Sequence, residues 1–150
     1  MRLVTVNKSF YTLCKKHGLE KEVLFNKDGR PCVLLVNLSY KGKCYDFAVP
    51  LRSNISATTP FSQYLSLPPR SDTKNGRHCG VHYVKLFPIT SKYVTKYHRP
   101  LSDIHFQAEL SVLQSSERKI IRACQSYLRR CEKGYRLPIT PDIDGIISIL

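Results

Sequence analysis

The strongest constraint on the fold is a β-hairpin pattern in the first half of the chain. Two runs rich in β-branched and aromatic residues, CVLLVNLSY (32–40) and CYDFAVP (44–50), flank the short segment Lys-Gly-Lys at 41–43. Two such runs around a glycine-containing turn are typical of paired antiparallel strands. Tyr45, Phe47 and Val49 alternate along the second run and predict one inward face. The sequence therefore predicts a hairpin as the centre of the fold.

The remaining segments predict strands first and helices later. We expect a strand at 2–6, a helix at 10–17 capped by Ser9 and ended by Gly18, and a loop at 19–29. After the hairpin, 51–80 has no clear period and 67–80 is expected to be a long exposed loop. Further strands are predicted at 81–86 and 92–97.

From Ser102 the apolar period changes to that of a helix. The pattern fits one helix over 102–133, or two with a break near 114–116. One apolar face is expected from Ile104, Leu110 and Leu113, continued by Ile120 and Cys124. A short C-terminal helix should start at Thr140, as its cap, and Pro141. This order predicts one α+β domain over 1–150, with an antiparallel sheet or small barrel and a long basic helix near the C-terminus.

The charge points to a polyanionic partner. The chain has 24 Lys and Arg against 11 Asp and Glu, a net charge of +13. Binding such a chain to nucleic acid releases condensed counterions. One basic region is helical, and another places cations beside Tyr93 and Tyr97, a combination that suits single-stranded RNA. The residues predicted to contact RNA are Lys8, Lys85, Lys92, Lys96, Arg99, Arg118, Lys119, Arg122 and Arg129.

Several classes of protein are disfavoured. No apolar run is long enough to span a membrane, and the N-terminal residues do not resemble a signal peptide, so we expect a cytoplasmic protein. The six cysteines form no C-x-x-C pair and are expected to be reduced, mostly buried thiols rather than zinc ligands. Nucleotide-binding fingerprints and a carboxylate cluster for Mg²⁺ are missing from the sequence, so no metal and no cofactor are predicted.

A nuclease with this composition would work without metal. The 2′-hydroxyl of RNA is an internal nucleophile, and cationic, hydroxyl and imidazole side chains can supply proton transfer and charge stabilisation. Arg30 precedes the first hairpin strand, and Arg52 and Ser53 follow the second. Because these ends are neighbours in an antiparallel hairpin, all three side chains are expected at one rim.

The segment GRPCVLLVNLSYKGKCYDFAVPLRSN (29–54) resembles the signature of the ToxN/AbiQ family, the toxin endoribonucleases of type III toxin–antitoxin systems. The matching features are Arg30-Pro31, the apolar strand, Gly42 and Pro50-Leu51-Arg52-Ser53. The opening MRLVTVNKSFY and the basic helix are also similar, and the short chain is most similar to the CptN-like branch. Where that family has a pair of hydroxyl residues, only Ser53 matches, because Arg52 stands at the first position.

The resemblance implies a compact, curved, β-barrel-like core akin to the MazF/Kid toxins, with added helices. It also implies metal-independent cleavage of cellular RNA to 2′,3′-cyclic phosphate ends. A repetitive antitoxin RNA, which the enzyme itself processes, would inhibit it within a closed protein–RNA assembly. Arg30 matches the family's basic catalytic position, and Arg30 and Arg52 would stabilise the transition state while Ser53 positions the scissile phosphate. Tyr11 or His105 would take part in proton transfer, with His105 standing in for a family tyrosine that is missing here.

Two alternatives remain open at this point. A non-catalytic RNA-binding module would share the basic regions but would not need the rim of Arg30, Arg52 and Ser53. A peripheral membrane protein would use the C-terminal amphipathic helix.

Overall fold

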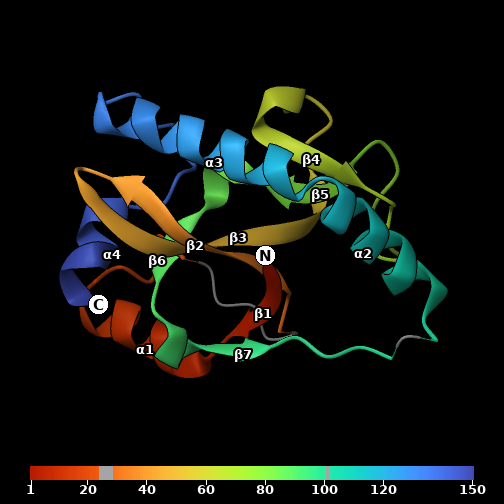
Figure 1. Ribbon diagram of the computed structural model, residues 1–150, viewed down its shortest axis with the longest axis horizontal. Coiled ribbons are helices and arrows are strands. Elements are labelled where there is room, and N and C mark those ends of the chain that lie inside the picture. The colour runs from red at the N-terminus through yellow and green to blue at the C-terminus, as the bar shows by residue number, and fades with distance from the viewer. Residues whose placement is uncertain (24–28, 101) are drawn as a thin grey trace.

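The fold is built on a seven-stranded antiparallel sheet. The computed structural model describes residues 1–23, 29–100 and 102–150. In the described part the strand order is β4-β5-β3-β2-β1-β7, and β6 pairs separately with β3 (Figure 1). The strands are β1 (Arg2–Val6), β2 (Cys32–Tyr40), β3 (Lys43–Ile55), β4 (Tyr64–Leu67), β5 (His78–His82), β6 (Phe87–Ile89) and β7 (Val94–Lys96).

The predicted hairpin is confirmed as β2 and β3. Lys41 and Gly42 at its turn both have positive φ angles, 49° and 76°, which match the right-handed twist of the strands they join. The register shifts between Leu35 and Leu38, where Asn37 also has a positive φ of 56°. β3 continues to Ile55, beyond the predicted end at residue 50, and this extension forms the edge on which β5 pairs.

In the described residues, four α-helices accompany the sheet: α1 (Lys8–Lys16), α2 (Ile104–Ser115), α3 (Glu117–Glu132) and α4 (Ile143–Ile149). Short 3₁₀ turns occupy η1 (Phe61–Gln63), η2 (Tyr83–Lys85) and η3 (Ser91–Tyr93). The region 102–133 is thus two helices, with the break at Ser116. Asn7 rather than Ser9 precedes α1, and Asp142 rather than Thr140 caps α4, accepting a hydrogen bond from the Gly145 amide.

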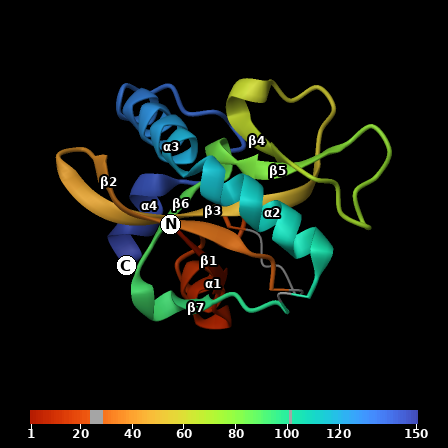
Figure 2. The same cartoon turned by 45° about the vertical axis from the view of Figure 1, so that its right-hand side comes forward.

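The helices cover both faces of the central strands. Leu35, Phe47 and Val49 belong to the apolar core on the side of α2 and α3, whereas Leu34 and Ala48 belong to a second core beneath α1 and α4. Figures 1 and 2 show α3 on one side of the sheet and α1 with α4 on the other in both views. Burial on both faces explains why the β2 run is almost continuously apolar rather than alternating.

Some predictions about individual segments were wrong. The region 51–80 is not irregular, because it contains the end of β3, β4 and the start of β5. The predicted strand at 81–86 is mostly the turn η2, and only 94–96 of 92–97 is a strand. Ile104 is 80% exposed, since it occupies the first turn of α2 and faces away from the core. The predicted loop at 19–29 includes residues 24–28, which lie outside the described residues.

Other expectations concern closure of the sheet, metals and membranes. The strand path ends at β4 and β7, so the described pairing is that of an open sheet, and a barrel-like, MazF/Kid-like core remains a prediction. Five of the six cysteines are buried and all are free, as expected. Within the described residues there is no group of three or more potential metal ligands. None of the helices described has the length and apolar character needed to cross a membrane.

Candidate active site

A basic cavity of about 430 Å³ lies beside the open end of the β2–β3 hairpin. Its walls come from the start of β2, the middle of β3, the turn η2, α1 and the loop before α4. Lys21, Arg30, Arg52 and Lys85 line it, with Glu22 as the one acidic residue among the described lining residues. The other lining residues are Tyr11, Val23, Cys32, Pro50, Leu51, Phe87, Pro138, Ile139, Thr140 and Pro141.

The hairpin register brings Arg30 and Arg52 together. Cys32 lies opposite Pro50, and the Leu51 amide donates a hydrogen bond of 3.1 Å to the Pro31 carbonyl. Arg30, two residues before β2, and Arg52, the residue after Leu51, therefore lie at the same end of the hairpin. The predicted meeting of these two arginines is confirmed by their shared place in the cavity wall.

The cations of the cavity repel one another. Burial lowers the pKa of Arg52, and the positive charges of Arg30 and Arg77 lower it further. Burial and Arg52 likewise lower the pKa of the Lys85 ammonium, against a smaller opposite effect of Glu22. A half-buried group of cations with one acidic neighbour favours an anionic ligand, which would relieve the repulsion.

The buried His82 ring contacts the guanidinium group of Arg52. The two nitrogens Arg52 Nη1 and His82 Nδ1 lie 3.3 Å apart. Because a guanidinium can only donate, Nδ1 is the acceptor and the ring carries its proton on Nε2. Burial, followed by the charges of Arg52 and Lys85, lowers the pKa of His82 to about 4, so the ring is neutral at pH 7. A neutral acceptor orients Arg52 without neutralising its charge.

Tyr11 extends from α1 into the cavity wall. Burial raises the pKa of its hydroxyl, and the neighbouring Cys32 and Cys14 thiols add to the effect. The hydroxyl therefore stays protonated at neutral pH and can donate a hydrogen bond to an anion.

Two of the predicted catalytic residues lie elsewhere. Ser53 is 2% exposed and is not among the residues that line the cavity, since alternation along β3 places its side chain on the face opposite to Arg52. His105 is on α2, where its Nε2 donates to the Pro69 carbonyl at 2.8 Å. The prediction that Ser53 lies beside Arg30 and Arg52 at one rim was therefore wrong.

The residues predicted to bind RNA fall in three places. Arg118, Lys119, Arg122 and Arg129 are exposed on α3, opposite its buried seam of Ile120, Cys124, Tyr127, Leu128 and Cys131. Lys8, Lys92, Lys96 and Arg99 are exposed around α1 and β7, on the other side of the sheet. There, Lys92 lies over the Tyr93 ring and Arg99 pairs with Asp103. Lys85 alone of this set lies in the basic cavity.

The sequence alone did not predict that His82 accepts a hydrogen bond from Arg52, or that Lys85 lies near Arg52. In the sequence, His82 stands out only as a possible zinc ligand near Cys79. Recognising β5 as the partner of β3 would have placed His82 near Arg52, but the short β4 and β5 strands have little local signal.

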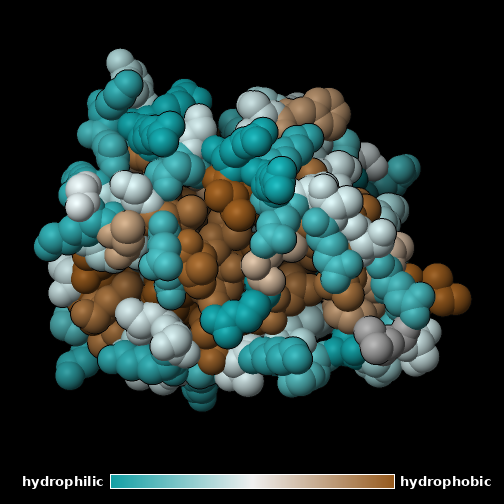
Figure 3. All heavy atoms as spheres, viewed as in Figure 1, coloured by the Kyte–Doolittle hydropathy of each residue, from teal (hydrophilic) through white to brown (hydrophobic). Residues whose placement is uncertain are grey.

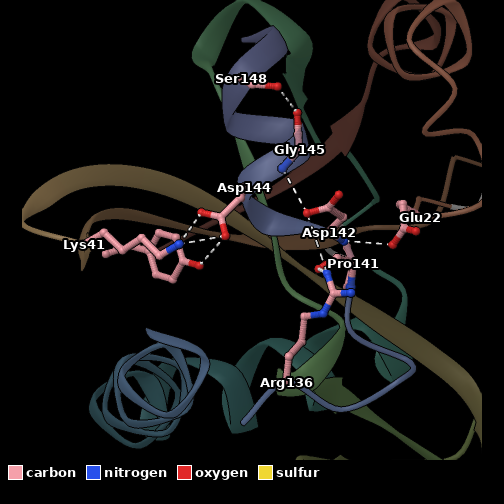
Figure 4. Close-up of polar contacts among 9 residues, drawn as sticks. Glu22, Lys41, Arg136, Pro141, Asp142, Asp144, Gly145 and Ser148 are labelled. Atoms are coloured by element: carbon pink, nitrogen blue, oxygen red, sulfur yellow. Dashed lines mark hydrogen bonds and ion pairs between the residues drawn. The ribbon is translucent and has the colours of Figure 1, made fainter. Parts of the chain in front are cut away.

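The loop before α4 is held against the cavity by a polar network (Figure 4). The Asp142 amide donates to Glu22 Oε2 at 2.8 Å, and the Asp142 side chain caps the Gly145 amide at 2.9 Å. Arg136 Nη1 donates to the Pro141 carbonyl at 3.4 Å. These contacts fix the wall formed by 138–141.

A larger cavity of about 630 Å³ lies between β1, β7 and α2. Apolar atoms line most of it, including those of Leu3, Val94, Phe106 and Leu110. Figure 3 shows apolar side chains gathered in the middle of this face of the molecule, rimmed by hydrophilic ones. Arg2, Lys96 and Arg99 also line this larger cavity, and the pKa of Arg99 is raised there. In the smaller cavity, burial and neighbouring positive charges lower the pKa values of Arg52 and Lys85, so we take the smaller cavity as the candidate active site.

Comparison with known proteins gives a result at the level of structure only. No family model and no curated protein matches the sequence. One similar solved structure is described as "Structure and activity of AbiQ, a lactococcal anti-phage endoribonuclease belonging to the type-III toxin-antitoxin system". It has 15% sequence identity and a TM-score of 0.69, and the match covers 98% of this chain and 93% of that one. This chain has the fold of the AbiQ structure.

Two further structures support the same fold. The first is described as "New insights into the mechanism of bacterial Type III toxin-antitoxin systems: selective toxin inhibition by a non-coding RNA pseudoknot", with 16% identity, a TM-score of 0.67 and coverage of 98% and 94%. The second is described as "A processed non-coding RNA regulates a bacterial antiviral system", with 11% identity, a TM-score of 0.66 and coverage of 99% and 96%. The structural neighbours thus share the fold over nearly the whole chain, and the particular similarity to the CptN-like branch remains a prediction.

Proposed function

We propose that the protein is a metal-independent endoribonuclease toxin of a type III toxin–antitoxin system, acting in the cytoplasm. The observation that carries the proposal is a pair of half-buried cations at the basic cavity, Arg52 and Lys85, which repel each other, with the exposed Arg30 close enough to add to the repulsion at Arg52. The shared fold supports it, because the AbiQ structure is described as that of an endoribonuclease.

The proposed reaction is transesterification within the RNA. The 2′-oxygen attacks phosphorus, the bond to the 5′-oxygen breaks, and the proton lost by the 2′-hydroxyl is balanced by one delivered to the leaving oxygen. Arg30 and Arg52 bind the non-bridging oxygens and stabilise their developing charge. Tyr11, which stays protonated, donates a hydrogen bond to the same phosphate.

Lys85 is the proposed proton-transfer group of the cavity. Its lowered pKa makes the ammonium a better acid than an exposed lysine and the amine more available at neutral pH. His105 lies outside the cavity, so Lys85 replaces it as the proposed proton-transfer residue. Ser53 keeps only an indirect part in the proposal, as a buried residue next to Arg52 on β3.

The proposed partners are cellular single-stranded RNA and a small repetitive antitoxin RNA that the toxin processes and that inhibits it. The exposed cations of α3 and of the β7 region supply binding surfaces on two sides of the sheet. An RNA bridging such surfaces on successive protein copies would give the closed assembly expected from the resemblance.

The test is incubation of purified protein with long single-stranded RNA in excess EDTA, followed by mapping of the product ends. Discrete cuts with 2′,3′-cyclic phosphate ends are expected, and they should disappear when cognate antitoxin RNA is added. Salt-sensitive binding without cleavage would instead identify an RNA-binding module. Ser53→Ala should cleave, since the residue does not line the cavity; its complete inactivation with an intact fold would contradict the assigned site.

A further inference from the structure

An aromatic group lies beyond the basic cavity, on β4, β5 and η1. The Tyr64 and His78 rings are stacked, with centroids 5.5 Å apart and an interplanar angle of 24°. The Phe61 ring lies 5.7 Å from Tyr64 and 6.2 Å from His78. Three rings thus form one contiguous group.

The strand register places this group on the face of the sheet that carries Arg52. Arg52 lies opposite Gly80 on β5, and Tyr64 on β4 lies opposite His82. Because side chains alternate along a strand, His78, Gly80 and His82 share one face. His78 is two residues from Gly80, so the rings lie on the order of 10 Å from Arg52.

Gly80 allows the rings to approach. A Cβ atom at this position would lie 2.3 Å from the Leu65 carbonyl oxygen and 3.0 Å from Tyr64 Cδ2. Any side chain here would push Tyr64 outward. The absence of a side chain at Gly80 therefore keeps Tyr64 packed against β5, where its ring supports His78.

Phe61 is 76% exposed, whereas Tyr64 beneath it is buried. Figure 3 shows apolar atoms at the corner that η1 occupies in Figure 1. Exposed Arg77 precedes His78 and lies close enough to lower the pKa of Arg52. An exposed ring packed against a buried tyrosine and a half-buried histidine, with cations alongside, resembles the aromatic platforms on which proteins stack unpaired bases beside bound phosphates.

We propose that Phe61 and His78 form a stacking site for one base of a single-stranded RNA whose neighbouring phosphate reaches Arg52 and Arg77. This inference rests on the proposed function, since it requires RNA to occupy the basic cavity. Every base has a π face, so the site binds without strict base preference and orients the strand across the cavity.

The test measures binding without cleavage. A short 2′-O-methyl RNA oligonucleotide carrying 2-aminopurine has no free 2′-hydroxyl and cannot be cut by transesterification. Phe61→Ala should weaken its binding by about 5- to 100-fold in fluorescence anisotropy and reduce the quenching of 2-aminopurine. Phe61→Tyr, which keeps the ring, should bind like the wild type. Tyr135→Ala removes a comparably exposed aromatic residue outside both sites and serves as the matched control.

Equal binding by the wild type and Phe61→Ala, or no binding by the wild type, would overturn the stacking site. Since Phe61 is exposed, its replacement should leave thermal unfolding unchanged, which excludes misfolding as the cause of a loss. Cleavage of unmodified RNA by the same preparations tests the nuclease separately. Phe61-dependent binding by a wild-type protein that never cleaves would uphold the stacking site and reject the nuclease.

Discussion

Two half-buried arginines on the same protein have opposite environments. Arg70, in the loop after β4, makes a two-point contact with buried Glu109 of α2, with nitrogen–oxygen distances of 2.8 and 3.2 Å. Burial acts to lower the pKa of Arg70, but the hydrogen bonds and charge of Glu109 outweigh it and raise the pKa. Arg52 faces neutral His82 and two other cations, and its pKa is lowered.

The contrast between Arg70 and Arg52 distinguishes a structural arginine from one available to bind a ligand. A buried charge with a fitted partner joins two segments, in this protein the 68–77 loop and α2. A half-buried charge among like charges costs stability and is retained where an anion must bind. The comparison therefore supports placing the proposed anion-binding site at Arg52 rather than on the basic exterior of α3.

The largest expected effect comes from exchanging each arginine for methionine. Arg70→Met leaves the Glu109 carboxylate buried without its partner and should lower the free energy of unfolding by about 3–5 kcal/mol. Arg52→Met removes a repelled charge together with the donor to His82 Nδ1, so these effects oppose each other and the loss of stability should be much smaller than in Arg70→Met. Urea denaturation of both variants measures their free energies of unfolding. Equal losses of stability would contradict the inferred difference between the two arginines.

Acid should destabilise the protein through His82. Its pKa is about 4 in the folded state and about 6.5 when unfolded, so between these values the unfolded chain binds more protons. Stability is therefore lost as the pH falls from 6.5 toward 4, by about 3 kcal/mol from this group. His82→Gln should lose correspondingly less over the same range. Parallel stability curves for the two proteins would show that the ring is not buried in its neutral form.

A smaller effect should reveal anion binding at the cavity. Inorganic phosphate at ten times its dissociation constant should stabilise the wild type by about 1.4 kcal/mol, measured at constant ionic strength. Arg52→Gln should lose this stabilisation, whereas Arg129→Gln on α3 should keep it. Equal stabilisation of all three proteins would mean that phosphate binds elsewhere.

The sequence was most informative where the determinants are local. The hairpin, the buried seam of Ile120 and Cys124 on α3, and the meeting of Arg30 with Arg52 follow from periodicity and antiparallel pairing. The pairing of β5 with β3 joins residues about 30 positions apart, and short strands such as β4 and β5 carry too little pattern to predict it. The role of His82 was missed for that reason. Ser53 was misplaced because neighbouring side chains of a strand point to opposite faces, so Ser53 and Arg52 cannot both face the cavity.

The most direct test of the central claim is single-turnover cleavage of single-stranded RNA in excess EDTA by Arg52→Gln and Arg129→Gln. The account predicts that Arg52→Gln loses about 100-fold or more in rate at saturating RNA, because a donor to the developing charge is removed. Arg129→Gln should keep that rate and weaken binding in a salt-dependent way. Wild-type cleavage rates in Arg52→Gln, or a loss confined to Arg129→Gln, would contradict the assignment of the cavity as the active site.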